Sequence, residues 1–438
     1  MFRKNLAKFV LAAFLGFSAV NCSAAEGEVD FPKIPASKGV PQFKVETVVE
    51  NVEIVWSIVF APDGRAFFTE RPGRVRVIEN GKLREKSFFT IPDIELSGES
   101  GLMGMVLHPN FKENHFVYLA YAYQDVAKEQ NVRVVRYRET GETLVEPRTI
   151  IEAIAASKYH AGTRLRFGPD AKLYITTGDA TKQKNAQNLS SINGKTLRLN
   201  DDGTIPSDNP FVNQKNVRPE IWSYGHRNAQ GMDFQPETGL MFQTEHGPSI
   251  IDGVSLFKRT GGDEVNIVER GKNYGWDKIS HSMTKKDMET PLIEFSPAIA
   301  PGSGMFYRGT LFPEFKNNFF FGALKGEMIV RLVMDGRRIV SRDNLLEKQY
   351  GRIREVAEAP DGSIYFSTSN RDGRGDAAQT DDRILRIVPL ETKTESVEIN
   401  KHKFEISQSY FAKLLFSSAF EHNTAQIALK DVKDSWFR

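Results

Sequence analysis

The sequence predicts an all-β protein folded as a six-bladed β-propeller, and a repeated turn motif carries most of this prediction. Six times along the chain, a proline opens a short polar turn that leads into a hydrophobic or aromatic run. Proline presets φ at the first corner of a turn, and Asp, Asn, Glu or Gly completes it, so each unit predicts the corner of a β-hairpin. Repeated units of one antiparallel sheet are typical of propellers. The turns begin at Pro62, Pro109, Pro169, Pro236, Pro313 and Pro360.

The composition agrees with this fold. Of the 438 residues, 40% are hydrophobic and 31 are phenylalanine, which favours β-structure with a substantial core. Between residues 48 and 389, short β-rich runs alternate with Gly, Asp, Asn and Pro. The 58 basic and 56 acidic residues leave a net charge of +2. This balance gives no reason to expect a nucleic-acid partner or binding to an anionic membrane surface.

Residues 1–25 predict a secretory signal peptide. Basic residues at positions 3, 4 and 8 precede an apolar run at 9–20, and small residues follow it. The run is too short to cross a bilayer comfortably, and no other segment is long and apolar enough, so we expect an exported protein without a membrane span. In an alternative reading Cys22, the only cysteine, is a lipidation site.

We assign residues 26–389 to the propeller and residues 390–438 to a C-terminal extension. In the extension, Tyr410, Phe411, Leu414 and Leu415 recur at helical spacing, and residues 427–432 could form a second short helix. The sequence therefore predicts a short helical appendage after the last blade.

Candidate chemistry lies in polar residues within glycine-rich segments, where a core role explains them poorly. His160 lies beside small residues just before the third repeated turn, and imidazole is a general base near neutral pH. Arg227 and Asn228 lie between glycines in a second segment, and arginine binds planar carboxylates or stabilises developing negative charge. Taken alone, each of these residues could also be an ordinary core or surface residue.

Two further groups suggest a bound anion and a cation. Asp263 and Glu264 follow a glycine pair, and carboxylates near glycine carbonyls suit a hard cation such as Ca²⁺. Lys325 lies in one such segment, and Arg352 and Arg354 lie in another. The two arginines alternate on one predicted strand and so share a face. If the three cations meet over the channel, they form a site for a polyanionic small molecule.

On seven motifs in a fixed order, the sequence resembles the soluble, pyrroloquinoline quinone-dependent aldose sugar (glucose) dehydrogenases, which are six-bladed propellers of the bacterial periplasm. The resemblance covers about residues 48–389 and implies a periplasmic location. The motifs are GLMGMVLHPNF (101–111), HAGTRLRFGPD (160–170), GKTLRLNDDGTIPSDNPF (194–211), PEIWSYGHRNAQGM (219–232), EHGP (245–248), GGDEVNIVERGKNYGW (261–276) and GALKG (322–326).

The resemblance implies a role for each candidate. His160 would take the proton from the C1 hydroxyl of a cyclic aldose while hydride passes to the quinone. Arg227 would hydrogen-bond the quinone oxygen on which charge accumulates. Glu99 would lie near the cofactor. The residues implied to hold the cofactor's carboxylates and ring oxygens are Asn228, Lys325, Arg352 and Arg354.

The resemblance also implies a calcium site. Gly247 and Pro248 would bind Ca²⁺ through their backbone carbonyls, and Asp263 and Glu264 would support that shell. The ion would hold the cofactor and polarise its reactive carbonyl. Here about a dozen residues, 249–260, separate EHGP from the GDE segment, which the family joins almost directly. This insertion adjoins the implied metal and substrate, so we expect it to cap the mouth of the site.

Two other functions compete with that of an aldose dehydrogenase. For the dehydrogenase, the sequence does not name the physiological sugar or the electron acceptor. A sugar- or partner-binding propeller could keep the fold without turnover, but His160 and Arg227 are both present. A Ca²⁺-dependent lactonase is possible because propellers also host metal hydrolases. The abundant cations favour an anionic cofactor over the side-chain metal shell that such a hydrolase needs.

Overall fold

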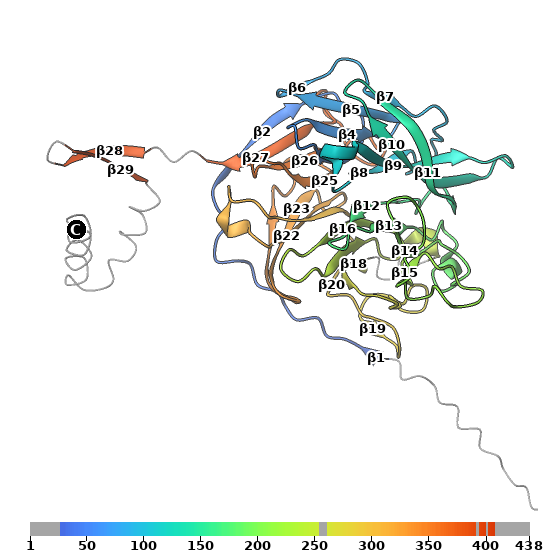
Figure 1. The fold of residues 1–438 in the computed structure, drawn as a ribbon. Coiled ribbons are helices and arrows are strands. Elements are labelled where there is room, and N and C mark those ends of the chain that lie inside the picture. The colour runs from blue at the N-terminus through green and yellow to red at the C-terminus, as the bar shows by residue number, and fades with distance from the viewer. Residues whose placement is uncertain (1–26, 254–260, 391–393, 400–401, 408–438) are drawn as a thin grey trace, which may run out of the picture.

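In a computed structural model the chain forms six antiparallel sheets arranged in a ring (Figure 1). The structure describes residues 27–253, 261–390, 394–399 and 402–407. Each sheet is one blade of four strands, and in the first blade β7 (Phe89–Thr90) pairs beside β6 on β5. The six-bladed propeller predicted from the repeated turns is thus confirmed.

In blades 1 to 5 the strands follow one another along the chain from the innermost to the outermost, and in blade 6 the first three strands do so. Blades 1 to 3 contain β3 (Val55–Phe60), β4 (Ala66–Glu70), β5 (Arg74–Glu79) and β6 (Lys82–Leu83); β8 (Leu102–Leu107), β9 (Phe116–Gln124), β10 (Gln130–Glu139) and β11 (Leu144–Ala155); and β12 (Leu165–Phe167), β13 (Leu173–Thr177), β14 (Lys195–Leu199) and β15 (Ile221–Tyr224). Blades 4 to 6 contain β16 (Ala229–Phe234), β17 (Met241–Glu245), β18 (Asp263–Val268) and β20 (Ile293–Phe295); β21 (Pro301–Phe306), β22 (Phe319–Ala323), β23 (Met328–Asp335) and β24 (Arg338–Leu345); and β25 (Ile353–Glu358), β26 (Ile364–Thr368), β27 (Ile384–Pro389) and β2.

The ring is closed by the first long strand of the chain. β2 (Phe43–Val49) pairs antiparallel with β27, with Phe43 opposite Pro389 and Thr47 opposite Leu385. The outermost strand of the last blade therefore comes from the N-terminal part of the chain. The closure leaves β25 and β3 as neighbours, and each innermost strand contacts the next around the ring.

All six repeated proline turns occupy the same structural position. Each joins the innermost strand of a blade to its second strand, from Pro62 between β3 and β4 to Pro360 between β25 and β26. The turns therefore gather at one end of the central channel. The starts of the innermost strands, and the long loops before them, lie at the other end.

Aromatic side chains fill the space between neighbouring blades. Phe242 of blade 4, for example, packs edge-on against Phe306 of blade 5, with ring centroids 4.9 Å apart. Burying such rings removes a large apolar area from water, which explains the phenylalanine-rich composition. The blades thus form one continuous framework for the loops above them.

A buried ion pair lies partway along the channel. Arg164 Nη1 is 2.8 Å from Glu355 Oε2, and both side chains are only 3% exposed. Arg164 also contacts Trp56 and the Gln230 carbonyl at the loop end, while Glu355 lines a cavity at the end with the proline turns. The pair therefore separates two cavities at opposite ends of the channel.

The remaining elements are short. They are α1 (Phe111–Asn114), the 3₁₀ turns η1 (Gln183–Asn185), η2 (Ile250–Asp252) and η3 (Pro313–Phe315), the pair β1 (Gly27–Glu28) and β19 (Met283–Thr284), and the hairpin of β28 (Thr394–Ile399) and β29 (His402–Ser407). The described part of the C-terminal extension contains a β-hairpin of residues 394–399 and 402–407. The positions of helical spacing at 410–418 and 427–432, and the predicted signal peptide, lie outside the described residues. Within the described residues, no helix is long and apolar enough to cross a membrane.

Candidate active site

A cavity of about 210 Å³ opens at the loop end of the channel, and all six blades contribute to its wall. Its lining contains five cationic side chains but only two carboxylates, those of Glu99 and Asp372. An excess of positive charge in a concave site favours an anionic ligand. The cations are Arg71, Lys158, Arg352, Arg354 and Arg374.

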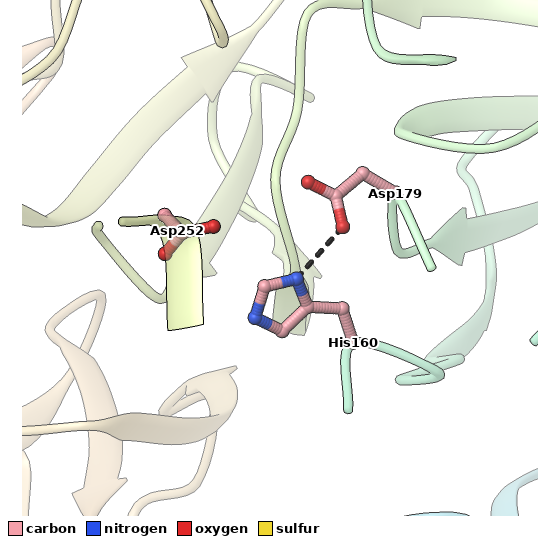
Figure 2. A group of neighbouring side chains, drawn as sticks. All are labelled: His160, Asp179 and Asp252. Atoms are coloured by element: carbon pink, nitrogen blue, oxygen red, sulfur yellow. Dashed lines mark hydrogen bonds and ion pairs between the residues drawn. The ribbon is translucent and has the colours of Figure 1, made fainter. Parts of the chain in front are cut away.

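His160 forms a buried pair with an aspartate that the sequence analysis did not single out. Its Nδ1 lies 2.7 Å from Oδ1 of Asp179, and the side chains are 3% and 0% exposed (Figure 2). Asp179 also accepts hydrogen bonds from the Thr181 amide at 2.7 Å and from Trp276 Nε1 at 2.8 Å. Because an ionised carboxylate only accepts, Nδ1 carries the proton and Nε2 is left as a base.

Backbone conformation places this pair. His160 lies in the loop before β12 with φ of 57°, a left-handed conformation, and Asp179 follows β13 and Gly178. A Cβ atom on Gly178 would lie 1.9 Å from the His160 carbonyl oxygen, so only glycine permits this approach. A glycine and an acid directly after a buried strand are the sequence signal that could have identified Asp179.

Arg227 is held by residues of the insertion. Its Nε and Nη2 donate to Oδ2 of Asp252 at 3.1 and 2.7 Å, and Nη2 also donates to Ser249 Oγ at 3.2 Å. Nη1 donates to the His246 carbonyl oxygen at 3.1 Å. Arg227 and Asp252 form an ion pair whose side chains are 4% and 3% exposed. Residues 249–253 thus reach the site, while 254–260 lie outside the described residues.

Asn228 follows Arg227, and within the described residues its side chain has no hydrogen-bond partner. The residue is fully buried, and both its amide nitrogen and its amide oxygen are unpaired there. Buried polar groups are nearly always satisfied, so an orphaned amide at a site indicates a missing ligand or water. This observation fits a residue that holds a polar cofactor.

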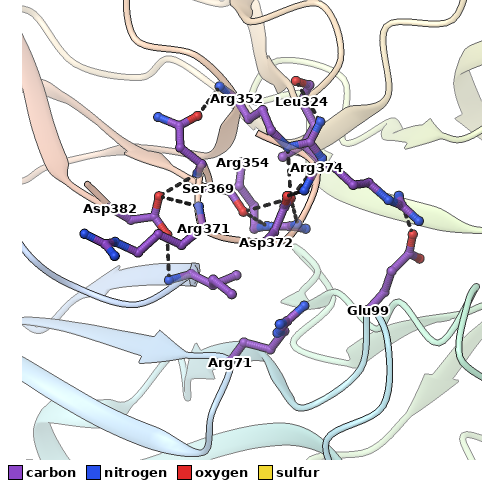
Figure 3. Close-up of polar contacts among 12 residues, drawn as sticks. Arg71, Glu99, Leu324, Arg352, Arg354, Ser369, Arg371, Asp372, Arg374 and Asp382 are labelled. Atoms are coloured by element: carbon purple, nitrogen blue, oxygen red, sulfur yellow. Dashed lines mark hydrogen bonds and ion pairs between the residues drawn. The ribbon is translucent and has the colours of Figure 1, made fainter. Parts of the chain in front are cut away.

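Arg352 and Arg354 share one carboxylate at the cavity wall (Figure 3). Asp372 Oδ2 accepts from Arg352 Nη2 at 2.8 Å and lies 3.4 Å from Arg354 Nη2. Burial lowers the pKa of Arg354 to about 10. Burial opposes ionisation of Asp372 as well, but the two arginines bring the pKa of its carboxyl below the usual range. Two guanidinium groups facing one carboxylate keep donors for a further anion.

Glu99 also lines the cavity, whereas the side chain of Lys325 does not. Oε1 of Glu99 lies 2.8 Å from Arg374 Nη1 (Figure 3). Its Oε2 accepts a long hydrogen bond of 3.4 Å from the His160 amide. Lys325 follows Leu324, which lines the cavity, but its own side chain is exposed. The sequence analysis expected Lys325 to join Arg352 and Arg354 at one anion site, but the Lys325 side chain does not line the cavity with them. It lies in the turn after β22, which directs its side chain to solvent.

The predicted calcium ligands lie in a loop held by Asp263. Oδ1 of Asp263 accepts from the Gly247 amide at 2.8 Å, while Oδ2 accepts from the Ile299 and Ala300 amides at 2.7 and 2.6 Å. Within the described residues no hydrogen bond ends on the carbonyl oxygens of Gly247 or Pro248. These two oxygens are therefore free to face a cation, while Asp263 supports the loop.

Glu264 lies in an acidic setting beside this loop. It lines a small cavity together with Gly247, Pro248, Arg227 and Trp276. Burial, and then repulsion by Glu245, raises the pKa of Glu264 to about 8. A nearby cation would relieve this repulsion. The donor set of two free carbonyl oxygens and an adjacent acidic group fits a hard cation such as Ca²⁺.

The protein is thus a propeller with a buried His–Asp pair beside a cationic cavity. This combination is suited to the oxidation of an alcohol with an anionic cofactor. The family model for Glucose / Sorbosone dehydrogenase matches residues 52–386, and the chain belongs to this family. The family resemblance and the propeller expected from the sequence are both confirmed.

Individual relatives agree with this assignment. The chain is 31% identical over 347 residues to Aldose sugar dehydrogenase YliI of Escherichia coli, covering 75% of this chain and 91% of that protein. It is 25% identical over 463 residues to Quinoprotein glucose dehydrogenase B of Acinetobacter calcoaceticus, covering 84% and 94%. The PQQ-bound aldose sugar dehydrogenase structure from Streptomyces coelicolor has a TM-score of 0.68 and 29% identity, covering 80% and 99%. These relatives support a sugar dehydrogenase of the PQQ-dependent type.

Proposed function

We propose that this protein oxidises the C1 hydroxyl of aldose sugars to the lactone, with pyrroloquinoline quinone as the hydride acceptor and Ca²⁺ bound beside it. The observation that carries the proposal is the buried His160–Asp179 pair at the cationic cavity. When bound, the quinone with its metal supplies the two-electron acceptor that the protein side chains lack.

The first step for the protein is proton removal. Asp179 fixes Nδ1–H of His160, so Nε2 accepts the proton of the sugar's C1 hydroxyl as the C1 hydrogen leaves with its electron pair. The sugar loses one proton and one hydride, and the hydride carries both electrons, which balances oxidation of the hemiacetal carbon to a lactone carbonyl. Asp179 stabilises the imidazolium that forms, as an orienting carboxylate does in other acid–base pairs.

The remaining residues bind and orient. Arg352 and Arg354 would hold cofactor carboxylates, with Asp372 keeping the two guanidinium groups in place. Asn228 would pair its orphaned amide with the cofactor, and Arg227 would donate to the oxygen on which negative charge grows. The carbonyl oxygens of Gly247 and Pro248 would ligate Ca²⁺. Lys325 could join the anion site only if its exposed side chain turned inward.

We also propose that the chain is exported to the periplasm, with residues 1–25 as signal peptide, 26–389 as catalytic domain and 390–438 as extension. The alternatives of a binding propeller and of a Ca²⁺-dependent lactonase receive less support. A binding module has no need for a buried base fixed by a carboxylate. In the described residues the free oxygens near Glu264 belong to the backbone, rather than to the carboxylate shell of a metal hydrolase.

Reconstitution tests the proposal. Protein freed of metal and cofactor should not reduce a dye with glucose until both pyrroloquinoline quinone and Ca²⁺ are added. Because neutral carbonyls need further oxygens to complete the Ca²⁺ shell, each ligand should raise the affinity of the other by the same factor. Aldose oxidation by protein shown to lack the quinone, or no activity with any aldose after full reconstitution, would refute the proposed function.

A further inference from the structure

Asp252 lies inside the insertion that separates the two metal-loop motifs, yet its side chain is buried at the His–Asp pair. One polar side-chain atom from each of His160, Asp179 and Asp252 lies within 4.8 Å of the other two. Figure 2 shows the second ring nitrogen of His160, the one not bound to Asp179, on the side of Asp252. A hydroxyl that approaches this nitrogen from that side therefore approaches the Asp252 carboxylate as well.

The two oxygens of Asp252 are used very differently. Oδ2 accepts from Arg227 and from the Ser249 amide at 2.8 Å, which fixes the side chain in the capped turn of η2. Within the described residues, Oδ1 receives only one long bond, 3.4 Å from Gln183 Nε2. A carboxylate oxygen accepts about two hydrogen bonds, so Oδ1 has capacity left for a donor from a ligand.

The carboxylate is charged, which limits the groups that it can receive. Burial acts to raise the pKa of Asp252, but Arg227 outweighs this effect and brings the pKa below the usual value. An ionised carboxylate accepts hydrogen bonds but donates none, and it attracts cations. It therefore favours a hydroxyl or an ammonium group and rejects an acceptor-only or anionic group.

We propose that Asp252 is a specificity residue that reads the substituent on C2 of the sugar. This inference rests on the proposed function, in which the C1 hydroxyl gives its proton to His160 Nε2. The C2 substituent is the neighbouring polar group along the sugar and would meet Oδ1 of Asp252. The substrates favoured are aldoses with a free C2 hydroxyl and 2-amino-2-deoxy aldoses with a charged amine. Aldoses without a donor at C2 are disfavoured.

The discrimination follows from leaving a buried acceptor without its partner. A site built to bond a substrate hydroxyl rejects an analogue that lacks it, because the protein group then stays desolvated and unpaired. We expect kcat/KM for 2-deoxyglucose to be at least about tenfold below that for glucose. We expect glucosamine, at slightly acidic pH where its amine is charged, to equal or exceed glucose.

The test compares these three sugars in the reconstituted wild-type protein and in Asp252→Asn, Asp252→Ala and Asp63→Asn. Asp63 is an exposed aspartate in the turn between β3 and β4, at the other end of the channel, and serves as the matched control. Asp252→Asn should reduce the preference for glucosamine over glucose about tenfold, because the charge is lost and the shape is kept. Asp252→Ala should also bring glucose and 2-deoxyglucose within about threefold of each other. Asp63→Asn should keep both ratios.

A loss of kcat/KM by the same factor for all three sugars would mean that Asp252 acts only by holding Arg227, and would overturn the inference. The ratios of sugars isolate the C2 contact, because a general effect on Arg227 or on folding cancels in them. Failure of the proposed function looks different: wild-type protein and Asp63→Asn would then oxidise none of the sugars after reconstitution.

Discussion

Replacing Asp179 with asparagine tests how the protein makes His160 a base. The three groups that bond the Asp179 carboxylate, His160 Nδ1–H, the Thr181 amide and Trp276 Nε1–H, are all donors. Oδ1 accepts from His160 and Thr181 and Oδ2 accepts from Trp276, so an asparagine NH₂ group must face a donor in either orientation. With its oxygen toward His160, the asparagine keeps that bond but lacks the negative charge that stabilises the imidazolium. With its NH₂ group toward His160, it favours the other tautomer, in which Nδ1 accepts and Nε2 carries the proton. In that form His160 cannot take a proton from the sugar.

The expected loss is large because the pair is buried. A wrong tautomer removes general base catalysis, so kcat should fall about 10²–10⁴-fold, or about 3–5 kcal/mol of transition-state stabilisation. The assay is dye reduction by glucose after reconstitution, with cofactor affinity measured separately by titration. His160→Ala should give a loss of similar size, and the double variant should be no worse than the worse single one, because the two residues act as a unit. An Asp179→Asn variant within about threefold of wild type would remove the pair from the reaction.

Three more predictions concern binding and stability. Arg354→Met should weaken cofactor binding about tenfold or more while leaving kcat at saturating cofactor nearly unchanged, as titration would show; an unchanged affinity would place the cofactor elsewhere. Lys195 donates to the carbonyl oxygens of Asn185, Ala186 and Asn193 at 2.7, 3.0 and 2.7 Å. Lys195→Met should therefore cost about 3 kcal/mol or more in urea unfolding, against almost nothing for the exposed Lys215→Met control. In the channel, Glu355→Met should cost about 3–5 kcal/mol because Arg164 is left buried and unpaired, whereas the double variant with Arg164→Met should lie within about 1 kcal/mol of wild type. Burial raises the pKa of Glu355 above 4.5, so the folded protein holds the Glu355 proton more tightly than the unfolded chain does. The stabilisation from this proton is present below pH 4.5 and is lost as the pH rises through the raised pKa. The unfolding free energy of the double variant should not show this decrease with pH; an equal decrease would contradict its assignment to Glu355.

The sequence predicts those parts of the fold that have a local signal. Each repeated turn needs a proline and a few polar residues in a row, and all six occur where the innermost strand meets the second. The pairing of β2 with β27 has no such signal, since it joins residues such as Thr47 and Leu385 that are far apart in the chain. An edge strand of ordinary composition does not reveal its partner.

The same distinction holds for the candidate site. His160, Arg227 and Arg354 lie in segments of unusual composition. Arg354 lines the cationic cavity, His160 follows Tyr159, which lines it, and Arg227 lines the small cavity beside Glu264. Arg71 and Arg374 lie in loops far apart in the chain that carry none of the recognised motifs, and only closure of the ring brings both to the cavity. For Lys325 the motif was recognised, but a short motif does not determine which way a side chain points, and this side chain is exposed.

Closure by β2 has a consequence for the order in which the protein can be made. The strand that completes blade 6 is synthesised near the start, but its partner β27 is among the last parts of the propeller to appear. A growing chain can build blades 1 to 5 one after another, yet their loops do not face a common centre until β27 has been delivered. The cavity, to which every blade contributes, thus does not exist on a partial chain. Loading of a ligand there must follow synthesis of essentially the whole propeller.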